Sequence, residues 1–550
     1  MLKGCEPWPE DLAQRYRERG YWQGDTLGEL LRAQAERNPR RIAVIDGERR
    51  WTYGELDNRA DRLAAGLHRL GLRAGQRVLV QLPNIAEFAS LFFALQRIGA
   101  IPVLALPAHR EIEIGHLAEL SQASAYVIAD HHHGYDYREL ARALKPRSAA
   151  LRHVLVVGQA EEFIALDTLD AEPIELPAPA ADEVAVLLLS GGTTGLPKLI
   201  PRTHDDYHYN ARASAEVTGL NADSRYLIVL PVAHNFPLAC PGLLGTLHAG
   251  GTAVFCADPD PDKTLEMIER ERITITALIP PLALLWLEAR DWNDADLSSL
   301  QWLQVGGARL KDESAARIRP QLGCRLQQVY GMAEGLLCYT RQDDGDERVL
   351  HTQGRPLADD DEVRIVDENE REVAEGEVGE LQVRGPYTLR GYYCAQEYNR
   401  RVFTADGYYR SGDLVRRLPG GYLAVEGRNK DVINRGGEKV PVEEVENLLL
   451  GHPAVLDVAI VGVPDATLGE RTCACVLARG EAPTLPELKT FLNRLGLAAF
   501  KLPDRLQVMQ QFPTTRLGKV NRKALAEQLL GTAPPNASSL EAAALGAEQP

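Results

Sequence analysis

The 550-residue sequence contains no apolar run long enough to cross a lipid bilayer. Its most apolar helical stretch, residues 88–98, is shorter than the roughly 20 residues that a spanning helix needs. The first residues also lack the apolar region of a signal peptide. We therefore expect a cytoplasmic protein without membrane insertion.

The sequence contains few cysteines and fewer basic than acidic residues. The one close pair among the eight cysteines, Cys473 and Cys475, has a spacing that suits neither a zinc site nor a thioredoxin-type site, so we expect reduced thiols. Acidic residues outnumber basic ones by 77 to 61, which gives a formal net charge of −16. Because an acidic surface repels nucleic acid, DNA and RNA are not expected as partners.

A loop rich in glycine and hydroxyl groups follows the short apolar run at residues 184–189. The loop reads Ser190, Gly191, Gly192, Thr193, Thr194, Gly195, Leu196, Pro197 and Lys198. Glycine lets backbone N–H groups approach a ligand closely, and the hydroxyl groups and lysine add donors for anionic oxygens. The loop is not a Walker A motif, because two residues separate the last glycine from Lys198. Taken alone, such a loop is more typical of a flexible polar connection. Further motifs downstream reverse this preference and favour a phosphate-binding loop.

Strand and helix patterns alternate along most of the chain. Residues 77–82 predict a strand and residues 86–98 a helix, and Thr52 with Glu55 forms a capping box at the start of another helix. This alternation predicts an α/β fold with a largely parallel sheet. Residues 362–383 alternate in polarity and predict a small antiparallel β region.

The sequence changes character after residue 426. We expect an N-terminal domain of α/β subdomains plus the small β region over residues 1–426, a hinge at residues 427–431 and an α+β C-terminal domain over residues 432–530. The latter is long enough for an independent domain of about 100 residues. Residues 531–550 are rich in Ala, Pro, Ser and Glu without periodicity, which predicts a disordered tail.

Five motifs occur in a fixed order along the chain. They are residues 190–198, residues 330–334, residues 409–413, residues 427–431 and residues 513–519. In this order they resemble the core motifs of adenylate-forming enzymes, which include acyl-CoA synthetases, peptide-synthetase adenylation domains and luciferases. The resemblance covers about residues 20–530. It implies that a carboxylate attacks the α-phosphorus of ATP, that pyrophosphate leaves, and that a thiol then displaces AMP.

The resemblance assigns roles to individual residues. Lys519 would be the catalytic cation that offsets repulsion between the carboxylate and the phosphate, and Lys430 would be the hinge about which the C-terminal domain moves. Tyr330 would stack on adenine, Asp413 would bind the ribose hydroxyl groups with Arg428 as a further donor, and Glu334 would hold Mg²⁺. The other expected ATP- and AMP-binding residues are Ser190, Gly191, Gly192, Thr193, Thr194, Gly195, Lys198, Gly307, Gly331, Met332 and Ala333.

Without the resemblance, three of these residues have simpler interpretations. Glu334 is also compatible with a carboxylate at a helix N-terminus, and Asp413 with an ordinary turn residue. Lys519 could be one of many surface lysines. The order of the motifs favours the functional interpretations, with ATP and Mg²⁺ as cofactors.

His234 and Asn235 indicate the class of acid. Amino-acid adenylation domains carry an aspartate at the place equivalent to Asn235, and a neutral amide cannot pair with a substrate ammonium but can hydrogen-bond a carboxylate or a phenolic hydroxyl. The string from His234 to Pro237 resembles the stand-alone aryl-acid adenylating enzymes of siderophore biosynthesis. By this resemblance His234 is a catalytic candidate, and the expected substrate-binding residues are Asn235, Phe236, Cys240, Gly306, Gly307 and Leu337. The alternative is that Asn235 merely caps a helix.

Cys240 and Leu337 bear on the choice between salicylate and 2,3-dihydroxybenzoate. By resemblance, dihydroxybenzoate enzymes carry Ser and Val at these places. A 3-hydroxyl left unpaired in a buried pocket costs about 1–3 kcal/mol, and Cys is a weak hydrogen-bond partner. Salicylate is therefore favoured, and 2,3-dihydroxybenzoate is the alternative.

The expected acyl acceptor is a separate protein, because the serine-centred motif of a carrier domain is absent from the sequence. We expect transfer to the phosphopantetheine thiol of an aryl carrier domain on a nonribosomal peptide synthetase. An aromatic acyl-CoA ligase, a luciferase-like oxygenase and a non-enzymatic nucleotide-binding regulator remain alternatives.

Overall fold

The computed structural model describes residues 1–190, 197–428, 432–435, 438–465, 468–495, 497, 499–514 and 520–531. Contacts divide the chain into two units, the first holding Met1–Ser411 with Val415–Val425 and the second holding Gly412–Leu414 with Glu426–Pro550. The predicted hinge residue Lys430 and the tail beyond residue 531 lie outside the described residues. The predicted domain limits, hinge and tail therefore stay predictions.

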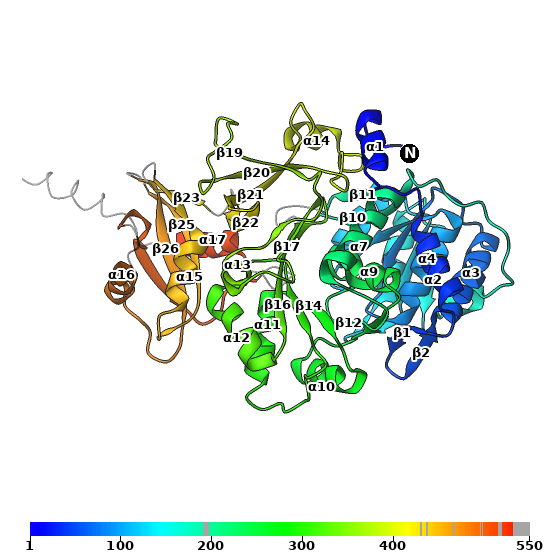
Figure 1. Cartoon of the computed structure of the whole chain (residues 1–550), viewed down its shortest axis with the longest axis horizontal. Coiled ribbons are helices and arrows are strands. Elements are labelled where there is room, and N and C mark those ends of the chain that lie inside the picture. The colour runs from blue at the N-terminus through cyan, green and yellow to red at the C-terminus, as the bar shows by residue number, and fades with distance from the viewer. Residues whose placement is uncertain are drawn as a thin grey trace, which may run out of the picture. The chain divides into compact units, whose positions relative to one another are not determined.

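A seven-stranded sheet, counted over the described residues, lies in the first unit (Figure 1). In spatial order its strands are β11 (Leu199–Thr203), β10 (Val184–Leu189), β4 (Ile101–Leu104), β3 (Arg77–Gln81), β5 (Ala125–Ala129), β8 (His153–Val157) and β9 (Ile164–Ala165). All neighbours are parallel except β10 and β11, which are antiparallel. Strands covered on both faces are continuous apolar runs, and β10 is buried from Val184 to Leu188.

A nine-stranded sheet lies in the same unit. In spatial order its strands are β18 (Arg355–Pro356), β17 (Gly335–Tyr339), β16 (Arg325–Met332), β15 (Trp302–Val305), β14 (Ile275–Leu278), β12 (Arg225–Ile228), β13 (Thr252–Phe255), β1 (Ile42–Asp46) and β2 (Arg49–Thr52). Its central pairs are parallel, whereas β2, β17 and β18 pair antiparallel at the two edges. The predicted, largely parallel α/β architecture is confirmed.

Helices pack against these sheets. They are α1 (Glu10–Glu18), α2 (Leu27–Arg37), α3 (Tyr53–Arg69), α4 (Ala86–Ile98), α5 (Glu111–Ser121), α6 (Tyr137–Leu144), α7 (His204–Thr218), α8 (Asn235–Ala239), α9 (Gly242–His248), α10 (Pro261–Glu271), α11 (Pro280–Ala289), α12 (Asp312–Leu322) and α13 (Asp346–His351), with 3-10 turns η1 (Lys145–Arg147) and η2 (Leu166–Leu169). The predicted capping box is present at the start of α3, where Glu55 N donates to Thr52 Oγ1 and Thr52 N donates to the Glu55 carboxylate. The helix predicted for residues 86–98 is α4, and its apolar composition is explained by burial on almost all sides.

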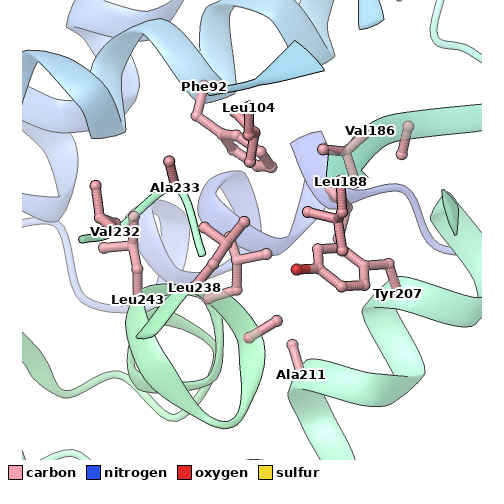
Figure 2. Packing of buried hydrophobic residues seen from close by; sticks show 14 of the residues in the cluster. Phe92, Leu104, Val186, Leu188, Tyr207, Ala211, Val232, Ala233, Leu238 and Leu243 are labelled. Carbon is pink, nitrogen blue, oxygen red and sulfur yellow. The ribbon is translucent and has the colours of Figure 1, made fainter. Parts of the chain in front are cut away.

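One continuous apolar core joins the two sheets through the helices between them. Figure 2 shows part of it, in which Phe92 of α4 and Leu104 of β4 face Leu238 of α8. The Tyr207 ring of α7 lies beside Leu188 of β10, with its hydroxyl oxygen directed into the cluster (Figure 2). This packing fixes α7 and α8, which both carry residues of the candidate site.

Residues 362–428 contain a further, four-stranded sheet. Its strands in spatial order are β19 (Glu362–Val366), β20 (Val378–Arg384), β21 (Tyr409–Leu418) and β22 (Tyr422–Arg428), and α14 (Gln396–Val402) precedes β21. The pairing of β19 with β20 is antiparallel, which confirms the small β region predicted for residues 362–383. A separate hairpin consists of β6 (His131–His132) and β7 (Tyr135–Asp136).

The second unit is an α+β domain in the part of the chain that the structure describes. Its sheet contains β23 (Val432–Arg435), β24 (Glu438–Pro441), β25 (Val455–Asp465), β26 (Gly469–Ala478) and β27 (Arg505–Met509), with α15 (Val442–Leu450), α16 (Leu485–Arg494), η3 (Ala499–Lys501) and α17 (Arg522–Gly531). Val445 and Leu449 of α15 and Leu488 of α16 pack on Ile460 and Val476 of the sheet. The predicted α+β character is confirmed.

Two buried histidines, His204 and His208, and the partly buried His248 lie where α2, α7 and α9 pack together. Leu27 N donates to His204 Nδ1 at 3.1 Å, and the rings of His208 and His248 meet edge to face with 5.5 Å between centroids. Burial lowers the pKa of each imidazole from 6.5 to about 4. All three therefore stay neutral in the folded protein at neutral pH.

The lowered pKa values of these imidazoles predict that the folded protein loses stability in acid. Because the folded-state pKa lies below the unfolded value, the unfolded chain binds more protons, and stability falls as pH drops from 6.5 towards 4. Between about pH 7 and about pH 5 one such group contributes of the order of 2 kcal/mol to this loss. We expect His204→Gln to lose less stability over this interval than the wild type, as measured by urea unfolding. His68→Gln, outside the cluster, is the control, and equal losses in His204→Gln and wild type would contradict the assignment.

Candidate active site

Three strands of the nine-stranded sheet lead to predicted site residues. β12 is followed by α8 with Asn235, β15 by Gly306 and Gly307, and β16 carries Tyr330. These strands belong to the parallel part of the sheet, so their carboxyl ends meet at one edge. Ligands of α/β proteins bind outside such an edge. The fold thus gathers segments that are distant in sequence.

His234, rather than Asn235, caps α8. Its Nδ1 accepts a hydrogen bond from Phe236 N at 3.3 Å, and Asn235 is the first residue of the helix. The alternative in which Asn235 serves as a helix cap is therefore excluded. The catalytic role of His234 stays a prediction.

Asn235 belongs to a network of buried polar side chains. Tyr207 Oη donates to Asn235 Oδ1 at 2.8 Å, and Asn235 Nδ2 donates to Cys240 Sγ at 3.3 Å. Asn210 Nδ2 donates to the same sulfur at 3.7 Å. Because Tyr207 engages the amide oxygen, the orientation of Asn235 is fixed, and its nitrogen keeps a second N–H that can be donated to a ligand oxygen.

The Cys240 side chain is a neutral thiol in this network. Burial raises its pKa to about 12, and 1% of the residue is exposed. It can therefore offer a ligand only the weak hydrogen bonding of a thiol.

Two motif glycines leave room for predicted pocket residues. A Cβ at Gly306 would lie 2.9 Å from Phe236 Cε1, and a Cβ at Gly331 would overlap Leu337 Cδ2. Gly331 and Leu337 are direct partners in the antiparallel β16–β17 pair. Gly307 has a φ of +79°, which glycine adopts readily. The structure therefore places Phe236 against Gly306 and Leu337 over Gly331.

A buried ion pair between Arg202 and Asp206 contacts this network at Tyr207. Arg202 Nε donates to Asp206 Oδ1 at 2.6 Å, and the two side chains are 1% and 4% exposed. The guanidinium also donates to Ala333 O at 3.1 Å and lies over the Tyr207 ring, 4.7 Å from its centroid. Burial raises the pKa of Asp206, and Arg202 opposes that shift. Arg202 thus connects β11, α7 and the segment that contains Glu334.

Glu334 lies in the turn between β16 and β17, not at a helix N-terminus. Tyr392 Oη donates to Glu334 Oε1 at 2.7 Å and lies 2.9 Å from Tyr409 Oη. Among the described residues no group of three or more His, Cys, Asp or Glu side chains could hold a metal ion alone. A single carboxylate fits Mg²⁺ that takes its remaining ligands from nucleotide phosphates and water.

Lys198 lies close to this cluster. Its Nζ is 4.2 Å from the centroid of the Tyr398 ring, which meets the Tyr392 ring edge to face at 5.4 Å. Ser190 N donates to Lys198 O, and Lys198 N donates to Ser190 Oγ, so the base of the glycine loop is closed. The Tyr398 ring thus links the loop lysine to Tyr392, the partner of Glu334.

The other predicted nucleotide residues are placed only in part. Tyr330 is half-buried against the core with Met332 and Ala333 near it, and Asp413 is a buried residue of β21. Arg428 ends β22. The loop residues Gly191, Gly192, Thr193, Thr194 and Gly195, the hinge residue Lys430 and the catalytic candidate Lys519 lie outside the described residues.

Several residues of the network are not apparent from the motifs. They are Arg202, Asp206, Tyr207, Asn210, Tyr392 and Tyr398. One signal was available, because Thr203 and Asp206 form a capping box directly after β11 and so place α7 beside the glycine loop. The tyrosines belong to no pattern of spacing.

Comparisons with known proteins identify the family. Residues 31–393 match the AMP-binding enzyme family, and residues 444–519 match the AMP-binding enzyme C-terminal domain. The chain therefore belongs to the AMP-binding, adenylate-forming enzymes. In the described residues no helix is long and apolar enough to span a membrane.

Similar proteins cover almost the whole chain. The 2,3-dihydroxybenzoate-AMP ligase of Bacillus subtilis is 54% identical over 96% of this chain and 98% of its own length, and pyochelin synthase PchD of Pseudomonas aeruginosa is 54% identical over 95% and 96%. The salicyl-AMP ligase / salicyl-S-ArCP synthetase of Mycobacterium tuberculosis is 52% identical over 96% and 95%. The apo structure of Mycobacterium smegmatis MbtA, 52% identical, superposes with a TM-score of 0.75 over 96% of this chain and 99% of that one.

The Arg202–Asp206 pair predicts a large loss of stability when one charge is removed. Arg202→Met leaves the Asp206 carboxylate buried without its cation, so we expect a loss of about 3–5 kcal/mol in denaturant unfolding. Arg202→Met combined with Asp206→Leu removes both charges and should cost less. Lys263→Met breaks the exposed pair with Asp258 and should leave stability unchanged. Equal effects of Arg202→Met and Lys263→Met would contradict the structural role of the buried pair.

Proposed function

We propose that this protein is an aryl-acid–AMP ligase of siderophore biosynthesis, with salicylate as its acid. The observation that carries the proposal is the orientation of Asn235. Tyr207 donates to its amide oxygen, so an amide N–H is left that suits a carboxylate or phenolic oxygen of the acid, whereas a neutral amide cannot form an ion pair with a substrate ammonium. The names of the relatives support the same class, since they include ligases for 2,3-dihydroxybenzoate and for salicylate.

The first proposed step joins two anions. A carboxylate oxygen of the acid attacks the α-phosphorus of ATP, the bond to the bridging oxygen breaks, and pyrophosphate leaves. Cations must offset the repulsion in this step, and Lys519 and Lys198 are the candidates on this chain. Mg²⁺ bound at Glu334 and the phosphates would supply further positive charge.

The second proposed step transfers the acyl group to a thiol. The sulfur attacks the acyl carbonyl carbon, and AMP leaves with its phosphate oxygen. We place the thiol on the phosphopantetheine arm of an aryl carrier domain of a nonribosomal peptide synthetase, as in a pyochelin-type pathway. Coenzyme A is the alternative acceptor, and a salicylyl-CoA synthase / salicylate adenylyltransferase of a Streptomyces species is 47% identical to this chain.

Cys240 and Leu337 favour salicylate over 2,3-dihydroxybenzoate. The Cys240 sulfur already accepts from two amides, and burial raises the pKa of the thiol to about 12, so a 3-hydroxyl would meet a weak and occupied partner. Leu337, 2% exposed, fills the space over Gly331. We therefore expect an extra hydroxyl to meet only a weak hydrogen-bond partner at Cys240 and a bulky side chain at Leu337.

The proposed activity predicts ATP–pyrophosphate exchange that depends on an aryl acid. Salicylate should support exchange with a kcat/KM about tenfold higher than 2,3-dihydroxybenzoate, the ratio expected for one unpaired buried hydroxyl. Lys519→Ala, as the inactive control, should lose the exchange without loss of folded protein. Exchange with no aryl acid at all would contradict the proposal, and a preference for 2,3-dihydroxybenzoate would contradict the choice of salicylate.

Substitution of Cys240 and Leu337 should shift the preference of the enzyme from salicylate towards 2,3-dihydroxybenzoate. Cys240→Ser with Leu337→Val supplies a stronger hydrogen-bond partner and removes one methylene, so we expect the ratio of kcat/KM to move about tenfold towards 2,3-dihydroxybenzoate. Cys324→Ser, which changes a buried thiol in a separate core cluster, is the control and should keep the wild-type ratio. An unchanged ratio in the double variant would remove both residues from the explanation of specificity.

A further inference from the structure

A buried phenol holds the backbone of Leu337 from outside the pocket. Leu337 N donates to Tyr387 Oη at 3.0 Å, and Tyr387 Oη donates to Asp361 Oδ2 at 2.6 Å. Tyr387 is completely buried. The same carboxylate oxygen accepts from Ala358 N at 2.9 Å, so Asp361 is itself anchored to the backbone. The position of Leu337 thus depends on two side chains that belong to none of the sequence motifs.

The surroundings leave Asp361 and Tyr387 little freedom. Asp361 Oδ1 is closed off from solvent without a hydrogen-bond partner among the described residues, and a Cβ at Gly385 would overlap it. Tyr209 of α7 packs on the Tyr387 ring at 5.8 Å between centroids. Tyr209 is two residues from Tyr207, the partner of Asn235. The same helix, α7, therefore contacts both Asn235 and the tyrosine that binds the backbone of Leu337.

The anchored backbone of Leu337 determines where its side chain lies in the proposed acid pocket. Its side chain occupies the space that a Cβ on Gly331 would take, and the two residues are paired across β16 and β17. Because protein interiors are close-packed, a shift of the Leu337 backbone must move its side chain relative to the ligand. Loss of the Tyr387 hydroxyl would leave Leu337 N without this acceptor and would remove one of the two donors to Asp361 Oδ2, the other being Ala358 N.

We propose that Tyr387 and Asp361 are a positioning pair that sets the place of Leu337 and thereby the preference among aryl acids. This inference rests on the proposed function, because it concerns the acid pocket of the same site. Neither residue touches the substrate in this account. The pair acts on acid binding and leaves nucleotide binding unchanged.

The direct test is Tyr387→Phe in the full-length protein, assayed by ATP–pyrophosphate exchange. We expect the KM for salicylate to rise about tenfold, with the KM for ATP unchanged. The ratio of kcat/KM for salicylate to kcat/KM for 2,3-dihydroxybenzoate should also change. The matched control is Tyr408→Phe, which removes another buried phenol that donates to a carboxylate, Glu362 Oε2 at 2.6 Å. Within the described part of the chain, Tyr408 makes no hydrogen bond with Leu337. The Tyr408→Phe variant should behave as wild type.

A double-mutant cycle tests whether Tyr387 acts through Leu337. The effect of Tyr387→Phe on the ratio of kcat/KM for the two acids should be smaller when Leu337 is already replaced by Val. The reason is that the effects of substitutions at coupled residues are not additive. If Tyr387→Phe does not yield folded protein, Asp361→Asn, which keeps an acceptor oxygen, should retain the wild-type ratio, whereas Asp361→Ala should lose it.

The outcomes separate this inference from the proposed function. Wild-type exchange with an unchanged acid KM and ratio in Tyr387→Phe would overturn the positioning pair alone. A parallel rise in the KM values for ATP and acid, or equal effects of Tyr387→Phe and Tyr408→Phe, would also overturn it. A wild-type protein without aryl-acid-dependent exchange would reject the proposed function and this inference together.

Discussion

The buried contact between Arg202 and Asp206 is the interaction on which the rest of the site depends. It joins the strand after the glycine loop to the first turn of α7, and the same guanidinium holds the carbonyl oxygen of Ala333. Desolvating two charges is costly, so such a pair contributes to stability only when its geometry is satisfied on all sides. Here it fixes the helix from which Tyr207 reaches Asn235.

Two chemically different regions meet at this ion pair. On one side the amide and thiol groups of Asn235 and Cys240 form a neutral, donor-rich surface suited to the oxygens of an aryl acid. On the other side Glu334, its tyrosine partners and Lys198 form a charged region suited to a nucleotide with its metal ion. The proposed reaction requires both regions, because it joins an aromatic carboxylate to a polyanion.

The sequence predicted the parts of the fold and site that depend on local pattern. The capping box at Thr52, helix α4 and the antiparallel region near residue 362 follow from spacing, polarity and turn residues, and the structure confirms them. The ordered motifs identified the family. The role of Asn235 depended on resemblance, and only the structure excluded a simple cap by placing His234 in that position.

The contacts that orient the site residues could not be predicted in this way. Arg202 lies 131 residues from Ala333, whereas Tyr387 lies 50 residues from Leu337 and Tyr392 lies 58 residues from Glu334. No periodicity encodes such pairs, because they arise from the packing of separate sheets and helices. The capping box of Thr203 and Asp206, next to Arg202 in the sequence, was the one local sign of them.

The central claim is that the fixed amide of Asn235 receives the acid. Its most direct test is a crystal structure of the protein with a hydrolysis-resistant salicyl-adenylate mimic. The account predicts a salicyl oxygen within hydrogen-bond distance of Asn235 Nδ2 and the ring against Leu337. A mimic bound with its ring away from Asn235, while Tyr207 still holds the amide, would contradict it.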